Sequence, residues 1–133
     1  MYEASQGGIS AGNYNTYGGV DIRSNRILGV GTGTSLAYGI SSTSPGSVVS
    51  DNVVSTLRGT NGSAAIYVSG NLSLVARNQL ADIGTQDASN AVYVYRCMSN
   101  YVKFRDNIGY VNSSNSQPNV NSSCPNGQFS GNF

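Results

Sequence analysis

The chain has 133 residues, with seven basic residues against six acidic ones and a formal net charge of +1. This balance excludes the basic surface that binds nucleic acid, and no apolar run approaches the length of a membrane span. Charged residues make up only 10% of the chain, whereas 17 residues are glycine and serine and asparagine are abundant. Such a composition is typical of a turn-rich all-β protein, and we expect neither nucleic acid nor a membrane as its partner.

Two kinds of short apolar segment alternate along the chain. The first is rich in Val, Ile or Tyr and stands at 7–10, 37–41, 65–69, 91–95 and 118–121. The second contains an asparagine and stands at 20–28, 47–54, 74–80, 103–110 and 128–133. Runs of this length with β-branched and aromatic residues predict strands, and no segment has the apolar spacing of a helix.

The second kind of segment repeats around one asparagine. The five asparagines follow one another in near-equal steps along the sequence, at Asn25, Asn52, Asn78, Asn107 and Asn132. Three residues before each of them stands an apolar residue: Ile22, Val49, Val75, Phe104 and Phe129. Two residues after, the first three segments have Ile27, Val54 and Leu80, and Gly109 is the exception. The chain therefore contains a repeat of about 26 residues, a period in the range of stacked-repeat proteins.

The first kind of segment gives a second register. Its last inward apolar positions advance along the chain in similar steps, at Ile9, Ile40, Val68, Val94 and Val120. Two registers that advance together predict a solenoid, in which each unit buries its apolar face only by stacking on its neighbours. We expect parallel pairing in one continuous stack, with Val49 beside Val75 and Val75 beside Phe104.

The pattern GI-x-V followed by V-x-x-N-x-I resembles the right-handed parallel β-helix superfamily, which includes pectate lyases, polygalacturonases and phage tailspikes. The resemblance covers residues 7–133 and implies an all-β, right-handed parallel β-helix (β-solenoid) of about five rungs, in a single domain over 1–133. An open end of such a stack exposes core and strand edges. We therefore expect a module of a longer or oligomeric protein, with a trimer or further domains capping the ends.

The repeated asparagines predict a stacked ladder. Equivalent side chains on adjacent rungs are about 4.8 Å apart, and an amide carries both a donor and an acceptor. Asparagine also tolerates the left-handed backbone of a tight turn. We interpret Asn25, Asn52, Asn78, Asn107 and Asn132 as structural rather than ligand-binding.

The residues just before the ladder include the candidates for catalysis. Stacking places Arg77 between Asp51 and Asp106, and two acids about 9–10 Å apart could be the acid and base of a glycosidase or lyase. An arginine between them lowers the pKa of both carboxyl groups, whereas a general acid needs a raised one. We therefore favour surface ion pairing. The chain has no histidine, and we expect neither a metal site nor a cofactor.

The first kind of segment also provides a candidate binding surface. Alternation places Ile66, Val68, Val92 and Val94 inside and sends Tyr67, Tyr93 and Tyr95 outward on adjacent rungs, with Arg96 next to them. Flat aromatic faces with hydroxyl tips beside a cation suit a sugar chain, and in the superfamily that the chain resembles this strand lines the substrate groove. The alternative is that tyrosine simply covers the sheet.

The two cysteines lie one repeat apart. Cys97 and Cys124 occupy nearly equivalent points on adjacent rungs, where equivalent Cα atoms are about 4.8 Å apart, within the range that a disulfide requires. A bridge would hold the Gly-, Pro- and Asn-rich last rung in place. In a reducing cytoplasm the same spacing fits two buried thiols.

Two functions remain. The first is a polysaccharide-recognising module, similar to tailspikes or pectin lyases, that binds and could cleave a cell-surface glycan. The alternative is a non-catalytic structural or assembly module of a phage or surface fibre. No signal peptide is visible in MYEASQGG, and we expect an extracellular or virion-associated protein.

Overall fold

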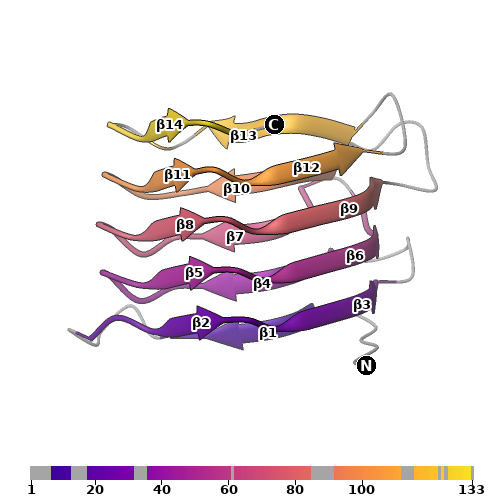
Figure 1. Cartoon of the computed structure of the whole chain (residues 1–133), viewed down its shortest axis with the longest axis horizontal. Coiled ribbons are helices and arrows are strands. Elements are labelled where there is room, and N and C mark those ends of the chain that lie inside the picture. Colours follow the sequence, from indigo (N-terminus) through magenta and orange to yellow (C-terminus); the bar gives the residue numbers. More distant parts are fainter. Residues whose placement is uncertain are drawn as a thin grey trace.

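The computed structural model describes residues 7–12, 18–31, 36–60, 62–84, 92–111, 116–122, 124 and 126–132. Every regular element in these ranges is a strand, and all strand pairs are parallel. The strands lie in layers that follow the chain from the N-terminal to the C-terminal end (Figure 1). The all-β parallel solenoid predicted from the repeat is confirmed.

Three sheets run along the stack, with five, five and four strands. The β1 sheet contains β1 (Gly7–Ala11), β4 (Tyr38–Ser42), β7 (Ala64–Val68), β10 (Val92–Cys97) and β13 (Ser116–Ser122). The β2 sheet contains β2 (Asp21–Arg23), β5 (Val48–Ser50), β8 (Leu74–Ala76), β11 (Lys103–Arg105) and β14 (Gln128–Ser130). The β3 sheet contains β3 (Arg26–Val30), β6 (Val53–Arg58), β9 (Gln79–Gly84) and β12 (Ile108–Val111). We call one strand from each sheet, taken in chain order, a coil. The first coil is β1, β2 and β3. The last coil consists of β13 and β14, because the described residues contain no fifth strand of the β3 sheet.

The apolar columns predicted around the asparagines form the core. Val49 pairs with Val75, and Val75 pairs with Phe104, as the repeat predicts. All three side chains are fully buried. The middle residue of β2, β5, β8 and β11 is thus buried, and stacking on neighbouring coils supplies the burial that a single coil could not provide.

The asparagine ladder is confirmed and lies at the bend between the β2 and β3 sheets, which we call the ladder corner. Asn52 donates its backbone N–H (3.0 Å) and its Nδ2 (2.9 Å) to Oδ1 of Asn78 in the next coil. The other Nδ2 hydrogen goes to the Ile22 carbonyl of the preceding coil (2.9 Å). The same N–H and Nδ2 pair joins Asn25 to Asn52, Asn78 to Asn107, and Asn107 to Asn132.

The left-handed residue of the ladder corner is the one before each asparagine. Positive φ angles occur at Ser24 (55°), Asp51 (57°), Arg77 (53°), Asp106 (55°) and Gly131 (61°). The expectation that asparagine itself takes up the left-handed backbone is therefore wrong. The sharp bend at the preceding residue instead turns the asparagine side chain inward, where Asn52, Asn78 and Asn107 are fully buried and bonded.

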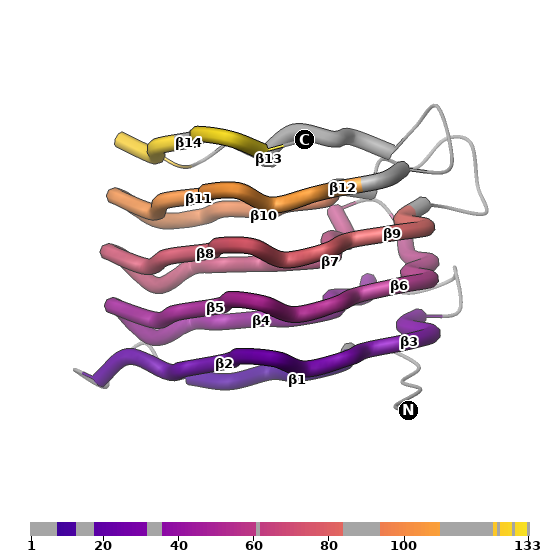
Figure 2. The backbone as a smooth tube through the Cα atoms, in the orientation of Figure 1, coloured from indigo at the N-terminus to yellow at the C-terminus, as the bar shows by residue number. Residues whose placement is uncertain are grey.

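A second bend joins the β1 sheet to the β2 sheet, and we call it the open corner. It too has a left-handed column, at Gly46 (69°), Leu72 (59°), Tyr101 (57°) and Asn126 (58°). Here the side chains of Leu72 and Tyr101 point to solvent, with exposed fractions of 69% and 57%. The bends of successive coils lie above one another along the stack (Figure 2).

The register of the β1 sheet differs from the prediction. Ile40 pairs with Ile66, Ile66 with Tyr95, and Tyr95 with Val120. The steps along the sequence between these partners equal the last three steps of the asparagine ladder, so both sheets follow one repeat. The predicted alignment of Ile40 with Val68 and Val94 is wrong.

The reason is that consecutive residues of β10 both point inward. A Cβ on Gly109 of β12 would lie 2.8 Å from Cγ1 of Val94, so Val94 faces the β3 sheet and fills the space that Gly109 leaves. The next residue, Tyr95, has its ring 5.3 Å from the ring of Phe104 in β11. The strand faces two sheets at once, and strict alternation of side chains therefore fails there.

Candidate functional site

The outer face of the β1 sheet gathers two tyrosines and an arginine from three successive coils. Ser41, Tyr67 and Arg96 stand in register on β4, β7 and β10. Their neighbours Ile40, Ile66 and Tyr95 are buried, so this column faces outward. Tyr38, at the start of the same strand as Ser41, completes the cluster. We call Tyr38, Tyr67 and Arg96 the aromatic column.

Close contacts fix the aromatic column. The rings of Tyr38 and Tyr67 are stacked, with centroids 4.7 Å apart and planes inclined by 18°. The Arg96 guanidinium lies 5.6 Å from the centre of the Tyr67 ring. Its Nη1 donates to the Tyr38 hydroxyl (2.8 Å) and to the Gly62 carbonyl (2.9 Å). Tyr67 thus lies between Tyr38 of the preceding coil and Arg96 of the following coil, which leaves it little free ring surface.

One ring face of Tyr38 is differently placed. The backbone of Tyr38 pairs with Ala64 of β7 on one side and with Gly7 of β1 on the other. Its ring stacks on that of Tyr67, which is the register partner of Ser41. On the other side of Ser41 stands the small residue Ser10 of β1. Among the described residues, the only ring contact of Tyr38 is with Tyr67. The arrangement offers a flat aromatic surface beside a guanidinium, with a hydroxyl at its edge.

Of the predicted binding residues, the structure brings Tyr67 and Arg96 together and places Tyr95 in the core. Tyr95 is only 4% exposed and packs in the core, so its predicted outward orientation is wrong. Burial raises the pKa of the Tyr95 hydroxyl, for which the described residues offer no hydrogen-bond partner. The backbone of Tyr93 pairs with Ala64, and its side chain lies outside the described part of the chain.

Tyr38 was missed by the sequence reasoning, although a signal for it exists. Extending the step from Asn52 to Asn78 to this strand pairs position 38 with 64 and position 41 with 67, as observed. Superposing AYGIS (37–41) on AIYVS (65–69) by their apolar ends instead puts Tyr38 opposite Ile66. That position is predicted to face inward.

The acidic candidates form ion pairs on the surface. Arg77 donates to Asp51 in bidentate fashion, from Nε to Oδ1 (2.7 Å) and from Nη2 to Oδ2 (2.8 Å). This hydrogen bonding lowers the pKa of the Asp51 carboxyl and raises that of Arg77. Asp106 is bonded to Arg105 (2.9 Å), its neighbour in the chain. Arg77 thus stands between the two acids in the column but bonds to Asp51, whose lowered pKa suits a permanent carboxylate better than a general acid.

The described residues contain no group of three His, Cys, Asp or Glu side chains placed to hold a metal ion. Nor do they include a helix with the length and apolarity to cross a membrane.

The cysteines are bonded to each other. Cys97 and Cys124 form a disulfide with Cα atoms 5.4 Å apart, which is the pairing that their spacing of one repeat indicates. Cys97 ends β10 and is fully buried, and Cys124 packs against the core in the open corner of the last coil. The bridge therefore joins the last two coils on the side away from the ladder corner.

No family model matches the chain, and no curated protein or solved structure matches it either.

Proposed function

We propose that the protein binds a polysaccharide along the outer face of the β1 sheet. The observation that carries this proposal is the position of Tyr38, whose ring stacks on Tyr67 of the following coil. On the other side, its strand pairs with β1, which has the small residues Gly7 and Ser10 at the matching positions. A pyranose presents an apolar face to an aromatic ring, and such contacts are favourable beyond the area that they bury.

The groups around Tyr38 suit the hydroxyls of a sugar. The Tyr38 hydroxyl is held by Arg96, and Ser41 and Ser10 continue the outward column toward the first coil. None of the ion pairs among the described residues involves Arg96. No carboxylate of the described residues therefore competes for its guanidinium, whose Nη2 can donate to ligand oxygens. Because Asp51 is paired and has a lowered pKa, the proposal covers binding and assigns no catalytic residue.

The disulfide supports a location outside the cytoplasm, since such bonds persist mainly in oxidising compartments. We propose that the protein is extracellular or virion-associated on this ground and on the resemblance described above.

Affinity electrophoresis on gels that contain neutral or acidic polysaccharides tests the binding. Tyr38→Ala should weaken retardation about 3- to 10-fold, the range expected for loss of one aromatic contact. Tyr101→Ala removes a more exposed tyrosine at the open corner and serves as the matched control, which should bind as the wild type does. Equal loss in both variants, or no retardation by any polysaccharide, would reject the proposal.

The second candidate is a structural module without a ligand. It is favoured by the ladder, which bonds every coil to the next through side chains as well as strands. If the folded protein shows no retardation on any of the polysaccharide gels, this alternative is supported.

A further inference from the structure

The asparagine ladder has a direction. Each of the first four ladder asparagines donates its N–H and one Nδ2 hydrogen to Oδ1 of the asparagine one coil later. None of the described bonds runs in the opposite direction. A column built in this way ends on an acceptor in the first coil and on donors in the last. The two ends are therefore chemically different and complementary.

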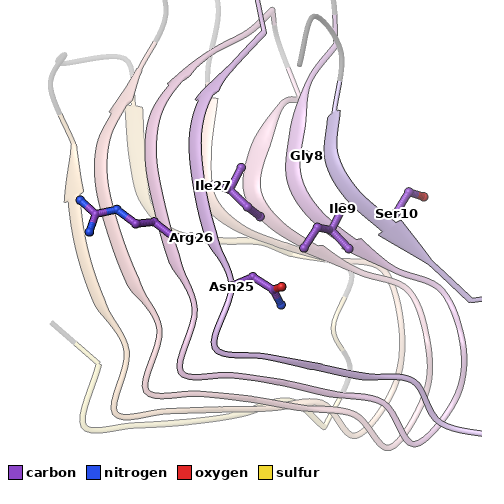
Figure 3. Close-up of a pocket in the computed structure, with 6 residues that line it drawn as sticks. All are labelled: Gly8, Ile9, Ser10, Asn25, Arg26 and Ile27. Carbon is purple, nitrogen blue, oxygen red and sulfur yellow. The ribbon is translucent and has the colours of Figure 1, made fainter. Parts of the chain in front are cut away.

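In the first coil, the acceptor receives no hydrogen bond within the part of the chain that the structure describes. Asn25 donates to Asn52 and, from Nδ2, to the Arg23 carbonyl (3.0 Å), whereas its Oδ1 accepts no hydrogen bond from the described residues. This amide lies in a pocket lined by Gly8, Ile9, Ser10, Asn25, Arg26 and Ile27. In Figure 3, Ile9, Asn25 and Ile27 point into the space that the coil encloses, and Arg26 and Ser10 point away from it.

In the last coil, two donors of Asn132 lack acceptors in the described ranges. Asn132 accepts both hydrogen bonds from Asn107 and gives one Nδ2 hydrogen to the Phe104 carbonyl (2.9 Å). Its backbone N–H and its second Nδ2 hydrogen have no acceptor among the described residues. The Phe129 carbonyl is the equivalent of the Phe104 carbonyl one coil later, since the two residues are in register.

We infer that a second copy of the chain stacks head to tail on the first, with Asn132 of one copy donating to Oδ1 of Asn25 in the next. The Nδ2 of Asn25, which now bonds within its own coil, would turn to the Phe129 carbonyl, as Asn132 does with Phe104. The contact continues the β1 and β2 sheets and covers the half-buried side chain of Ile9, whereas Ile27 is already buried within one copy. It leaves the β3 sheet interrupted, because the last coil has no strand in that sheet among the described residues.

The charges permit this contact. Asn126, Gln128 and Ser130 of the last coil are exposed and uncharged. In the first coil, Asp21 and Arg23 neutralise each other in an ion pair. Solenoids usually protect their edges with charges or caps, and β14 has neither a charged residue nor a proline. Because the contact joins unlike ends it does not close, so the expected product is a filament rather than a dimer. The inference is independent of polysaccharide binding.

A disulfide across the junction tests the geometry. Arg23 and Ser130 belong to one in-register column of the β2 sheet, so their Cα atoms would be about 4.8 Å apart across a stacked junction, within disulfide range. The double variant Arg23→Cys/Ser130→Cys should oxidise to a ladder of dimers, trimers and longer chains on a non-reducing gel. Arg23→Cys/Ser55→Cys has as many introduced thiols but places one in the middle of the β3 sheet, and it should give no such ladder.

Light scattering on the unmodified protein provides the second measurement. We expect the mass to rise with concentration above the 13.8 kDa of one chain and to continue beyond two copies. Asn25→Ala, which leaves the ladder from Asn52 to Asn132 intact, should shift this rise to higher concentration. A mass that stays at one chain, or that stops at a dimer, would overturn the inference, as would equal cross-linking of the two cysteine pairs.

Discussion

The ladder corner and the open corner turn the chain by the same means but are stabilised differently. The ladder corner places a left-handed residue in all five coils and the open corner in the last four, yet only the ladder corner repeats one side chain in all of its coils. At the ladder corner, the side chain after the bend is buried and its amide must be bonded in both directions along the stack. At the open corner, Leu72 and Tyr101 point to solvent, and the last coils are joined by a disulfide.

Burial, and not the bend itself, therefore selects the residue at each corner. A left-handed backbone alone accepts Ser24, Asp51, Arg77 and Leu72 with no common chemistry. A buried polar group without partners costs about 1–3 kcal/mol, so the position that hydrogen-bonds up and down the stack admits only a side chain with both a donor and an acceptor. Serine performs part of this function at the open corner, where Oγ of Ser73 accepts from the Ser47 N–H (3.2 Å).

The largest effect is expected at the centre of the ladder. Asn78→Ala removes the acceptor of two hydrogen bonds from Asn52 and leaves the Val49 carbonyl without its Nδ2 donor, all in the core. Loss of about 3–5 kcal/mol in the free energy of unfolding should follow, measured by urea denaturation. Leu72→Ala, at the open corner, should change it by less than about 0.5 kcal/mol. Similar losses in the two variants would remove the distinction between the corners.

The disulfide should come next. Replacing both Cys97 and Cys124 by alanine opens a loop with a sequence separation of 27 and should cost about 3 kcal/mol. Because coils interact mainly with their neighbours, the loss should be local. Hydrogen exchange should show faster exchange in β13 and β14 with β5 and β8 unchanged. Uniform loss of protection in all coils would instead mean that the bridge supports the whole stack.

Relief of backbone strain at the open corner should give a smaller effect of opposite sign. Leu72 has φ = 59° and a largely exposed side chain, so Leu72→Asn places a residue that tolerates this backbone at little cost in burial. We expect a gain of about 0.5–1 kcal/mol in thermal or urea unfolding. Leu74→Asn, two residues along and half-buried in β8, is the matched control and should destabilise the protein.

The smallest effect is expected for the surface pair beside the ladder. Asp51 has a pKa below the ordinary value of 3.8 because Arg77 hydrogen-bonds its charged form, so the pair stabilises the folded state above that value and ceases to do so as the pH falls through the lowered pKa. Asp51→Asn should therefore lower the melting temperature slightly at neutral pH. The difference from the wild type should shrink as the pH falls below 3.8 and vanish once the carboxyl group is protonated in the folded protein. A difference that grows on acidification would contradict the assigned direction.

The sequence predicted the features that depend on burial in the core, namely the asparagine ladder, the apolar column beside it and the pairing of the β2-sheet strands. The ladder asparagines and the apolar residues three positions before them recur because the three middle coils bury the same two positions, and the strand pairing follows from that register. The register of the β1 sheet was less predictable because Val94 and Tyr95 both point inward, toward different sheets. The pattern of apolar residues alone does not reveal two consecutive inward side chains.

The aromatic column was the least predictable feature. Its contacts depend on a register in the β1 sheet that only the asparagine step reveals, and Tyr38 stands in a segment that was aligned by its apolar end. The left-handed positions were hidden for a different reason, since an exposed bend accepts many side chains and leaves no residue signature.

Exchange of side-chain amide protons, followed by nuclear magnetic resonance, compares the two corners within one molecule and tests the ladder most directly. If the ladder is buried and hydrogen-bonded, the Nδ2 protons of Asn52, Asn78 and Asn107 exchange with solvent far more slowly than those of Asn71 and Asn100. The latter two residues are exposed at the open corner. Exchange of the three ladder amides as fast as that of Asn71 and Asn100 would show that no buried ladder exists, and it would contradict the solenoid itself.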